Sequence, residues 1–257
     1  MNQSLKFPMD AFLAPDWPAP AGVRAVCTTR TGGVSAAPYD SLNLGDHVGD
    51  EAAHVVANRE IFQQAIGARP VFLNQVHGTQ VVALDASTPD GTVADACYTG
   101  QRGLACTVMV ADCLPVLFAT TNGHRVAAAH AGWRGLAGQG GVGILEATVR
   151  QLGSDHIIAW LGPCIGPQAF EVGGEVRAAF IATHPLAGDC FKALKPGKWL
   201  ADLAGLARLR LRALGISQIY GNNSSAIWCT VGNASRFFSY RRDRVTGRFA
   251  ASIWLEG

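Results

Sequence analysis

The feature that most constrains the fold is the alternation of short apolar runs with turn sequences. Ten runs rich in Val, Ile, Ala and Thr predict strands, at residues 23–29, 70–76, 81–85, 104–112, 115–121, 125–131, 157–162, 218–221, 236–242 and 249–255. Four longer stretches have helical patterns, at residues 51–67, 141–153, 173–184 and 199–215. Strands outnumber helices, and short turns such as "TTNGH" and "VTGR" join several of them. The pattern favours an α+β fold, with mixed or antiparallel sheets covered by helices, over a regular doubly wound array.

No linker or low-complexity tract divides the 257 residues, and this length is near the upper limit for one hydrophobic core. We therefore expect a single domain over residues 1–257. The formal net charge of +2 is too balanced for a protein that binds nucleic acid. The chain has no signal-peptide pattern and no apolar run long enough to cross a bilayer. We expect a monomeric, cytoplasmic protein whose partners are small molecules, with no nucleic acid and no membrane.

Three of the predicted strands end at residues suited to chemistry. "PVFLNQV" is followed by His77, "LACTVMVAD" by Cys113, and "RVAAA" by His130. Neighbouring strand ends converge in space, so these side chains can meet. Two imidazoles and a thiolate are ligands that Zn²⁺ prefers, and three protein ligands leave a fourth position open for water or substrate. The sequence thus predicts a catalytic metal site, although the spacing matches no local zinc motif.

The same residues allow other interpretations. Cys113 could act as a thiolate nucleophile with His130 as its base, as in cysteine hydrolases. Asp112 could orient a histidine or act as a base if the strand breaks before Pro115; the alternative is an ordinary turn aspartate. A closed, structural zinc site would need a fourth ligand, for which Cys229 is the candidate, but a buried strand position explains that residue equally well.

Two segments supply candidate substrate-binding residues. In "AHAGWRG", the glycine-rich approach to a helix could offer backbone N–H groups to an anion, and Arg134 could add a bidentate contact; a tight turn is the alternative. In the long polar loop "TTRTGGVSAAPYDSLNLGDHVGD", Arg30 and Asn43 supply hydrogen-bond donors and His47 a further polar group. The alternative is an ordinary surface loop, but this would not account for so many hydrogen-bonding residues between apolar segments.

Seven motifs in order resemble the bacterial YfiH family, whose members are also called laccase-like multicopper polyphenol oxidases or purine nucleoside phosphorylase family proteins. The motifs are "TTRTGGVS", "SLNLGDHVGD", "NQVHG", "ADCLPVLF", "AHAGWRG", "LGPCIGP" and "SYRRDRVTGR". The resemblance implies a four-layer α-β-β-α sandwich with mixed sheets, similar in fold to toxin deamidases that use a Cys/His pair. It also implies a zinc site formed by His77, Cys113 and His130.

The resemblance implies three activities. The one we favour is a zinc-dependent purine nucleoside enzyme that phosphorolyses adenosine, inosine and methylthioadenosine and also deaminates adenosine, with Asp112 as a candidate general acid. The second is an amidase that removes a misincorporated L-Ser from a nucleotide-linked peptidoglycan precursor. The third is weak phenol oxidation by Cu²⁺ in the same site; a true multicopper oxidase needs about ten histidines, and this chain has 7.

Overall fold

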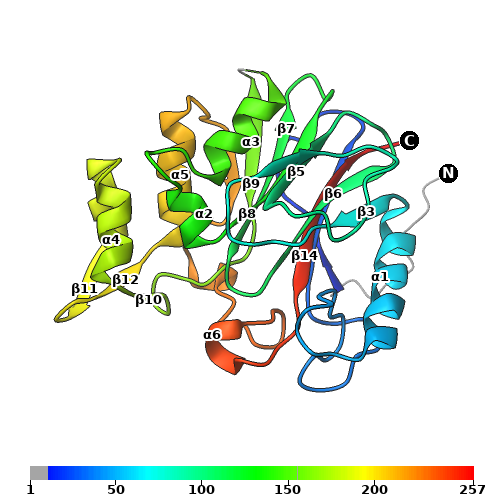
Figure 1. The fold of residues 1–257 in the computed structure, drawn as a ribbon, viewed down its shortest axis with the longest axis horizontal. Coiled ribbons are helices and arrows are strands. Elements are labelled where there is room, and N and C mark those ends of the chain that lie inside the picture. The colour runs from blue at the N-terminus through cyan, green and yellow to red at the C-terminus, as the bar shows by residue number, and fades with distance from the viewer. Residues whose placement is uncertain (1–10, 155) are drawn as a thin grey trace.

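The two fully buried strands β6 (Leu104–Val110) and β7 (Leu114–Thr120) lie in different sheets, although only three residues separate them. Every residue of both strands is buried, because both faces of each strand are covered. These relations come from a computed structural model, which describes residues 11–154 and 156–257 (Figure 1). The corner between β6 and β7 carries the chain from one sheet to the other.

The strands form three sheets. The five-stranded sheet has the order β1 (Phe12–Leu13), β2 (Val23–Thr28), β14 (Phe249–Leu255), β6 and β3 (Arg69–Phe72). The six-stranded sheet has the order β13 (Ile219–Gly221), β9 (Ile157–Leu161), β7, β8 (Val126–Ala131), β5 (Ala96–Thr99) and β4 (Val81–Ala83). The small sheet has the order β10 (Glu171–Gly173), β12 (Lys198–Ala201) and β11 (Phe191–Lys195). Both large sheets contain parallel and antiparallel pairs, which confirms the predicted mixed α+β class.

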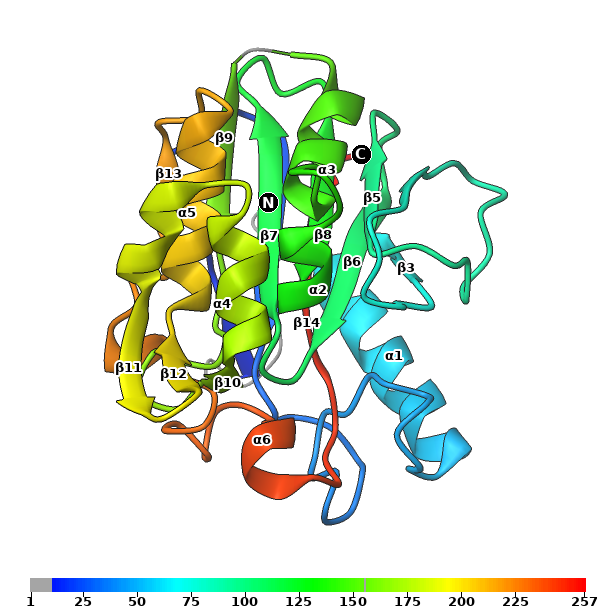
Figure 2. The ribbon, with the colours of Figure 1, turned by 60° about the vertical axis from the view of Figure 1, so that its left-hand side comes forward.

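Helices cover the sheets on opposite sides. The α-helices are α1 (Ala52–Ile66), α2 (Trp133–Ala137), α3 (Ile144–Leu152), α4 (Gly174–Ile181), α5 (Leu203–Ala213) and α6 (Tyr240–Asp243), with 3₁₀ turns η2 (Pro185–Cys190) and η3 (Ala226–Trp228). Figure 2 shows α2, α3, α4 and α5 in front of the six-stranded sheet, whereas α1 lies beyond the five-stranded one. Among the described helices, none has the length and apolarity that a bilayer crossing requires.

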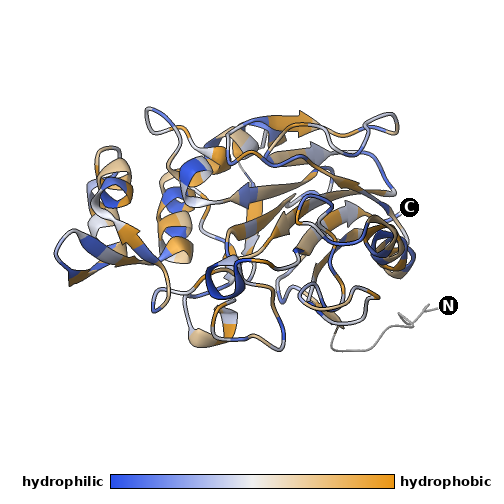
Figure 3. Ribbon diagram, turned by 60° about the horizontal axis from the view of Figure 1, so that its bottom comes forward, coloured by the Kyte–Doolittle hydropathy of each residue, from blue (hydrophilic) through white to orange (hydrophobic). Residues whose placement is uncertain are grey.

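Three buried clusters hold these parts together. One joins α2, α3 and α5 to the six-stranded sheet and includes Phe118 and Leu206. A second fills the space between the two large sheets and includes Trp160 and Phe249. The third joins α1 to the five-stranded sheet through Phe62. The strands carry most of the hydrophobic colour in Figure 3, as expected for sheets that lie between other layers.

Two sequence predictions of secondary structure were wrong. Residues 236–242 were predicted as a strand, but residues 236–239 form a loop and residues 240–242 belong to α6. Phe237 and Phe238 in the loop are buried against the sheet. Residues 199–215 were predicted as one helix, but β12 occupies the beginning and α5 starts after Asp202. The Asp202 carboxylate accepts a hydrogen bond from Gly205 N at 2.8 Å, so it caps the helix and marks the true start.

A buried ion pair links α3 to α5 on the outside of the six-stranded sheet. The Arg210 guanidinium donates to Glu146 Oε1 at 2.8 Å and to the Gly141 carbonyl at 2.7 Å. The other carboxylate oxygen of Glu146 accepts from Gly143 N at 2.8 Å and so caps α3. Both charged side chains are almost fully buried, at 6% and 14% exposure, so each depends on the other for compensation.

Removing one partner of this pair should destabilise the protein strongly. We expect Arg210→Met to lower the free energy of unfolding by about 3 kcal/mol, because Glu146 would stay buried without a counter-ion. The matched control is Arg212→Met, an exposed position on the same helix, where a change below about 0.5 kcal/mol is expected. Urea unfolding of the two variants measures the difference; equal stabilities would contradict this role of the pair.

Candidate metal and active site

A cleft of about 440 Å³ lies at the corner between β6 and β7. Its wall combines aromatic and aliphatic side chains with histidines and arginines. The lining residues are His47, Gln75, His77, Met109, Val110, Ala111, Asp112, Cys113, His130, Trp133, Ile165, Phe170, Leu203, Tyr240, Arg241 and Arg248. Of the predicted site residues, this list contains all three metal-ligand candidates and Asp112.

The corner itself is made by Asp112, whose φ of 93° lies in the left-handed region. Its carboxylate accepts hydrogen bonds from Thr230 Oγ1 and from Arg241 N, both at 2.6 Å. These bonds hold the backbone in its sharp turn and aim Cys113 into the cleft. The predicted break before Pro115 is confirmed, but Pro115 itself pairs inside β7, so the break is caused by Asp112.

The carboxylate of Asp95 organises the two histidines. It is fully buried directly before β5 and accepts four hydrogen bonds. The Oδ1 atom accepts from His77 N and His130 Nδ1, both at 2.8 Å, while Oδ2 accepts from Gly78 N at 2.6 Å and Val76 N at 3.2 Å. Because the carboxylate binds the Nδ1–H of His130, the Nε2 atom of that ring is left for Cys113 or a metal.

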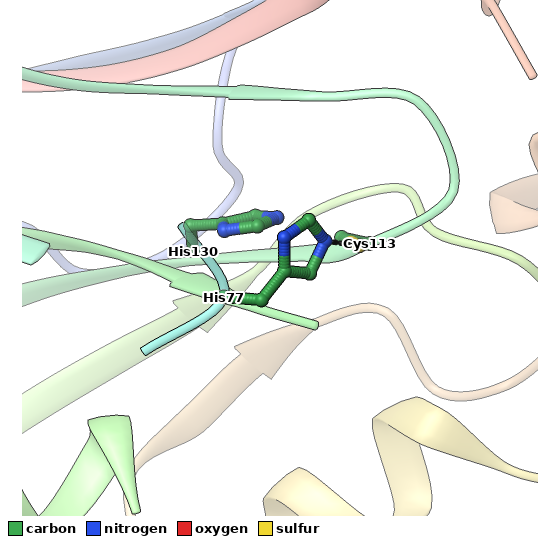
Figure 4. Close-up of side chains that lie close together, drawn as sticks. All are labelled: His77, Cys113 and His130. Atoms are coloured by element: carbon green, nitrogen blue, oxygen red, sulfur yellow. Dashed lines mark hydrogen bonds between the residues drawn. The ribbon is translucent and has the colours of Figure 1, made fainter. Parts of the chain in front are cut away.

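The three ligand candidates meet within the cleft. The Sγ atom of Cys113 lies 3.6 Å from His77 Nε2, and the imidazole rings of His77 and His130 have centroids 4.7 Å apart (Figure 4). The ring of His130 is buried, whereas His77 is exposed at the mouth. One ligand atom from each of the three residues lies within 4.8 Å of the others. The structure therefore brings the predicted trio together.

These contacts shift the pKa values of Cys113, His130 and Asp95. Burial opposes ionisation of Cys113, but the positive charge and hydrogen bond of His130, with help from His77, lower the pKa of the thiol to about 6. Burial likewise opposes protonation of His130, but Cys113 and Asp95 raise its pKa to about 9. The pKa of Asp95 is lowered, because hydrogen bonds from His130 and Gly78 outweigh its burial. Near neutral pH, Cys113 and His130 form a thiolate–imidazolium pair in the metal-free chain.

The donor set also fits a tetrahedral metal ion. Zn–N bonds of about 2.1 Å and Zn–S bonds of about 2.3 Å place nitrogen and sulfur ligands about 3.6 Å apart, which matches Cys113 and His77. Among the described residues, this is the only group of three or more His, Cys, Asp or Glu positioned to hold a metal. The candidate fourth ligand, Cys229, is not in the group; its Sγ accepts from Gly166 N at 3.3 Å. The site therefore offers three protein ligands, as an open metal site does.

The glycines of "AHAGWRG" make room for this centre. A Cβ atom on Gly132 would lie 2.7 Å from His77 Cδ2 and 3.0 Å from Cys113 Sγ, and one on Gly135 would lie 2.7 Å from the Gly78 carbonyl oxygen. The anion site predicted at the following helix start finds no support, because Gly143 N already donates to Glu146. These glycines are explained by close packing around the ligands.

Of the polar residues predicted around the substrate, His47 lines the cleft, whereas Arg30, Asn43 and Arg134 lie outside its lining. The Arg30 guanidinium donates to the Asp40 side chain and to the carbonyls of Asp40 and Ala234. Arg134 is exposed and stacks on Trp133 at 4.6 Å. Asn43 is fully buried, and its amide bonds to Asp50 and to the backbone. Asn43 reaches the cleft through the backbone of Arg248, and Arg134 through the ring of Trp133, both of which line it. Their roles in substrate binding stay predictions.

Sequence reasoning missed Asp95 and the cleft arginines. Asp95 directly precedes the apolar run "ACYT", which was not recognised as a strand; the rule that polar residues at strand ends carry function, applied to that run, would have found it. Arg241 and Arg248 lie in "SYRRDRVTGR", a motif that carries the family resemblance but in which neither arginine was assigned a role from the sequence. Burial of Arg248 lowers its pKa, which the charges of Cys113 and Asp112 partly offset, so its guanidinium lies within electrostatic reach of the ligand set.

Known proteins resemble this chain over nearly its whole length. The family model described as "multi-copper polyphenol oxidoreductase laccase" matches residues 24–256. A purine nucleoside phosphorylase of Pseudomonas aeruginosa is 53% identical over 251 residues, which cover 96% of this chain and 100% of that protein. The purine nucleoside phosphorylase YfiH of Escherichia coli is 50% identical over 252 residues, with the same shares covered.

Solved structures also resemble this chain over nearly its whole length. A Neisseria meningitidis protein has a TM-score of 0.90 with 48% identity and covers 96% of this chain and 100% of its own. YlmD from Geobacillus stearothermophilus has a TM-score of 0.87 with 32% identity, and the match covers 98% of this chain and 99% of that one. The names of the curated relatives support an enzyme. The chain belongs to the multi-copper polyphenol oxidoreductase laccase family, also known as the YfiH family.

Proposed function

We propose that the protein is a zinc-dependent purine nucleoside enzyme. It releases the base of adenosine, inosine and methylthioadenosine by phosphorolysis and also deaminates adenosine. The observation that carries the proposal is the three-ligand His–Cys–His set, which faces a cleft with both apolar and cationic walls. The names of the relatives as purine nucleoside phosphorylases support it.

The cleft has the chemistry that a nucleoside and an anion need. Phe170, Leu203 and Met109 offer apolar surface to a purine ring, while the guanidinium groups of Arg241 and Arg248 offer positive charge to an oxyanion. Zinc held by the three ligands would supply a Lewis acid. A cleft of about 440 Å³ is within the range of small-molecule sites.

The chain's own groups hold the ligand set ready. Asp95 fixes the Nδ1–H tautomer of His130 and the turn that carries His77, so neither ring needs to reorganise when a ligand binds. For deamination, Asp112 stays our proposed general acid. It would first have to release Thr230 or the backbone N–H of Arg241, because its carboxylate is engaged by both.

Two other activities use the same residues. The low pKa of Cys113 and its pairing with His130 favour a thiolate nucleophile, which supports the amidase that removes L-Ser from a peptidoglycan precursor as the second candidate. Copper in the same site is the third candidate, with weak phenol oxidation. Several copper ions would need several sites, and the described residues offer one group of ligands.

We also propose the finer architecture and setting that the resemblance implies. The order of the three buried clusters, from helices through two sheets to α1, supports an α-β-β-α sandwich related to the toxin deamidases. A single domain over residues 1–257, a monomeric state and a cytoplasmic location stay predictions.

The proposed activity and its metal can be tested together. Zinc-loaded protein should release adenine from adenosine only when phosphate is present, and should form inosine by deamination; chelation should abolish both. Cys113→Ala should lower zinc content and activity by at least about tenfold, because it removes one of three ligands. The matched control is Cys190→Ala, a half-buried cysteine outside the cleft.

The readouts separate the alternatives. Product chromatography with adenosine, with and without phosphate, distinguishes phosphorolysis from deamination, and incubation with the serine-containing precursor tests serine release. Serine release without any nucleoside turnover would favour the amidase. Full zinc content and activity in Cys113→Ala would show that the site assignment is wrong.

The thiolate at the centre predicts an unusual pH dependence of alkylation. In metal-free protein, labelling of Cys113 by iodoacetamide should be half-maximal near pH 6, because the thiolate fraction rises as the pH passes the thiol's pKa. Cys190, whose pKa is raised by burial to about 11, is an internal control that should stay unlabelled at neutral pH. His130→Gln should move the half-maximal pH of Cys113 above about 8. Peptide mass spectrometry measures both sites; the same profile in His130→Gln as in wild type would contradict the pairing.

A further inference from the structure

The position of Arg248 in the cleft is fixed by its backbone. Its N–H donates to Asn43 Oδ1 at 2.8 Å, and its carbonyl accepts from Leu44 N at 3.0 Å. The preceding Gly247 passes between two side chains, since a Cβ there would lie 2.7 Å from Phe238 Cζ and 3.0 Å from Asn43 Cβ. The Arg248 backbone is therefore clamped against the polar N-terminal loop, and its side chain is directed into the cleft.

The guanidinium group of Arg248 is held in place by carbonyl groups, but no carboxylate of the described residues pairs with it. Its Nη1 atom donates to the carbonyls of Thr246 and Gly247, both at 3.0 Å, which fixes the direction of the fork. Several other arginines pair with carboxylates, such as Arg59 with Asp46. Within the described part of the chain, no carboxylate lies at ion-pair distance from Arg248 or from Arg241.

A half-buried guanidinium with no carboxylate at ion-pair distance favours an anionic ligand. The Arg241 guanidinium is also held by carbonyls, at 3.1 Å from that of Glu171, and lies over the ring of Phe170. Both groups line the same cleft as the metal-ligand set. Two preoriented guanidinium groups beside an apolar wall match the shape and charge of a tetrahedral oxyanion.

We infer that Arg248, together with Arg241, forms the subsite for the phosphate that attacks the nucleoside. This inference rests on the proposed function and moves the phosphate away from Arg30 and Arg134. Asn43 then has a positioning role, because its side-chain oxygen holds the Arg248 backbone and its amide is tied to Asp50 at 2.9 Å. The loop that carries Asn43 thus acts on the substrate through Arg248.

Phosphorolysis needs a phosphate oxyanion next to C1′ of the ribose. An oxygen of HPO₄²⁻ forms a bond to C1′ of the ribose while the C1′–N9 bond breaks. The electron pair of that bond stays on the purine, which takes up a proton equivalent to the one that phosphate loses. The products are the free base and ribose 1-phosphate. Guanidinium groups orient the phosphate without accepting its proton, since arginine stays charged.

Phosphate binding and phosphate kinetics test the subsite on zinc-loaded protein. Arg248→Gln should weaken the binding of inorganic phosphate in isothermal titration calorimetry, and raise the KM for phosphate, by at least about tenfold. The KM for adenosine and the deamination rate, which need no phosphate, should change by less than about threefold. Arg248→Lys should recover part of the phosphate affinity, because it keeps the charge but loses the fork.

Arg236→Gln is the matched control. Arg236 is a partly buried guanidinium that stacks on Phe237 at 5.0 Å outside the cleft lining, so its loss should leave phosphate binding unchanged. Unfolding midpoints and zinc content verify that each variant is folded. If Arg248→Gln does not fold, Arg248→Lys and Arg241→Gln provide the same comparison.

The outcomes distinguish the subsite from the function. Wild-type protein that releases adenine with phosphate, alongside an Arg248→Gln variant with unchanged phosphate affinity and KM, would overturn the subsite and leave the function intact. A loss of phosphate affinity in Arg134→Gln instead would also overturn it. Wild-type protein that binds phosphate through Arg248 but releases no base would refute phosphorolysis, and with it the role of that phosphate as the attacking group, while the binding of an oxyanion at Arg248 would stand. An effect of Arg248→Gln confined to hydrolysis of the serine-containing precursor would overturn the assignment to phosphate.

Discussion

The buried carboxylate of Asp95 is the interaction on which the site depends. A carboxylate with no solvent exposure costs several kcal/mol to bury unless its oxygens are satisfied, and here four donors satisfy them. Three of those donors are backbone N–H groups of the turn that carries His77, and the fourth is the ring of His130. One charge therefore fixes the positions of two ligands, one in the loop between β3 and β4 and the other on β8.

The third ligand is positioned by a change of sheet. The chain leaves β6 and enters β7 through Asp112, whose left-handed backbone is held by Thr230 and by the start of α6. Cys113 is the next residue, so the turn between the two sheets places its thiolate beside the histidines. The elements that make this corner also carry Arg241, which links the geometry of the metal ligands to the cationic wall of the cleft.

Strand content and ligand identity were accessible from the sequence, because both follow local rules. Apolar runs with turns between them predicted most of the strands, and residues at strand ends predicted His77, Cys113 and His130. What failed depends on tertiary contacts. Phe237 and Phe238 look like a strand but are buried in a loop against the sheet. Asp95 was missed because the run after it was not recognised as a strand, although its partner His130 lies 35 residues away. The position of Arg248 depends on Asn43, 205 residues away, which no local pattern shows.

The most direct test of the account is the position of the metal in a crystal of zinc-loaded protein, located by anomalous diffraction at the zinc edge. The account predicts one strong peak, about 2.1 Å from Nε2 of His77 and of His130 and about 2.3 Å from Sγ of Cys113, with no fourth protein ligand. A peak bound elsewhere, or a peak coordinated by a fourth protein side chain, would contradict an open catalytic metal centre at this site.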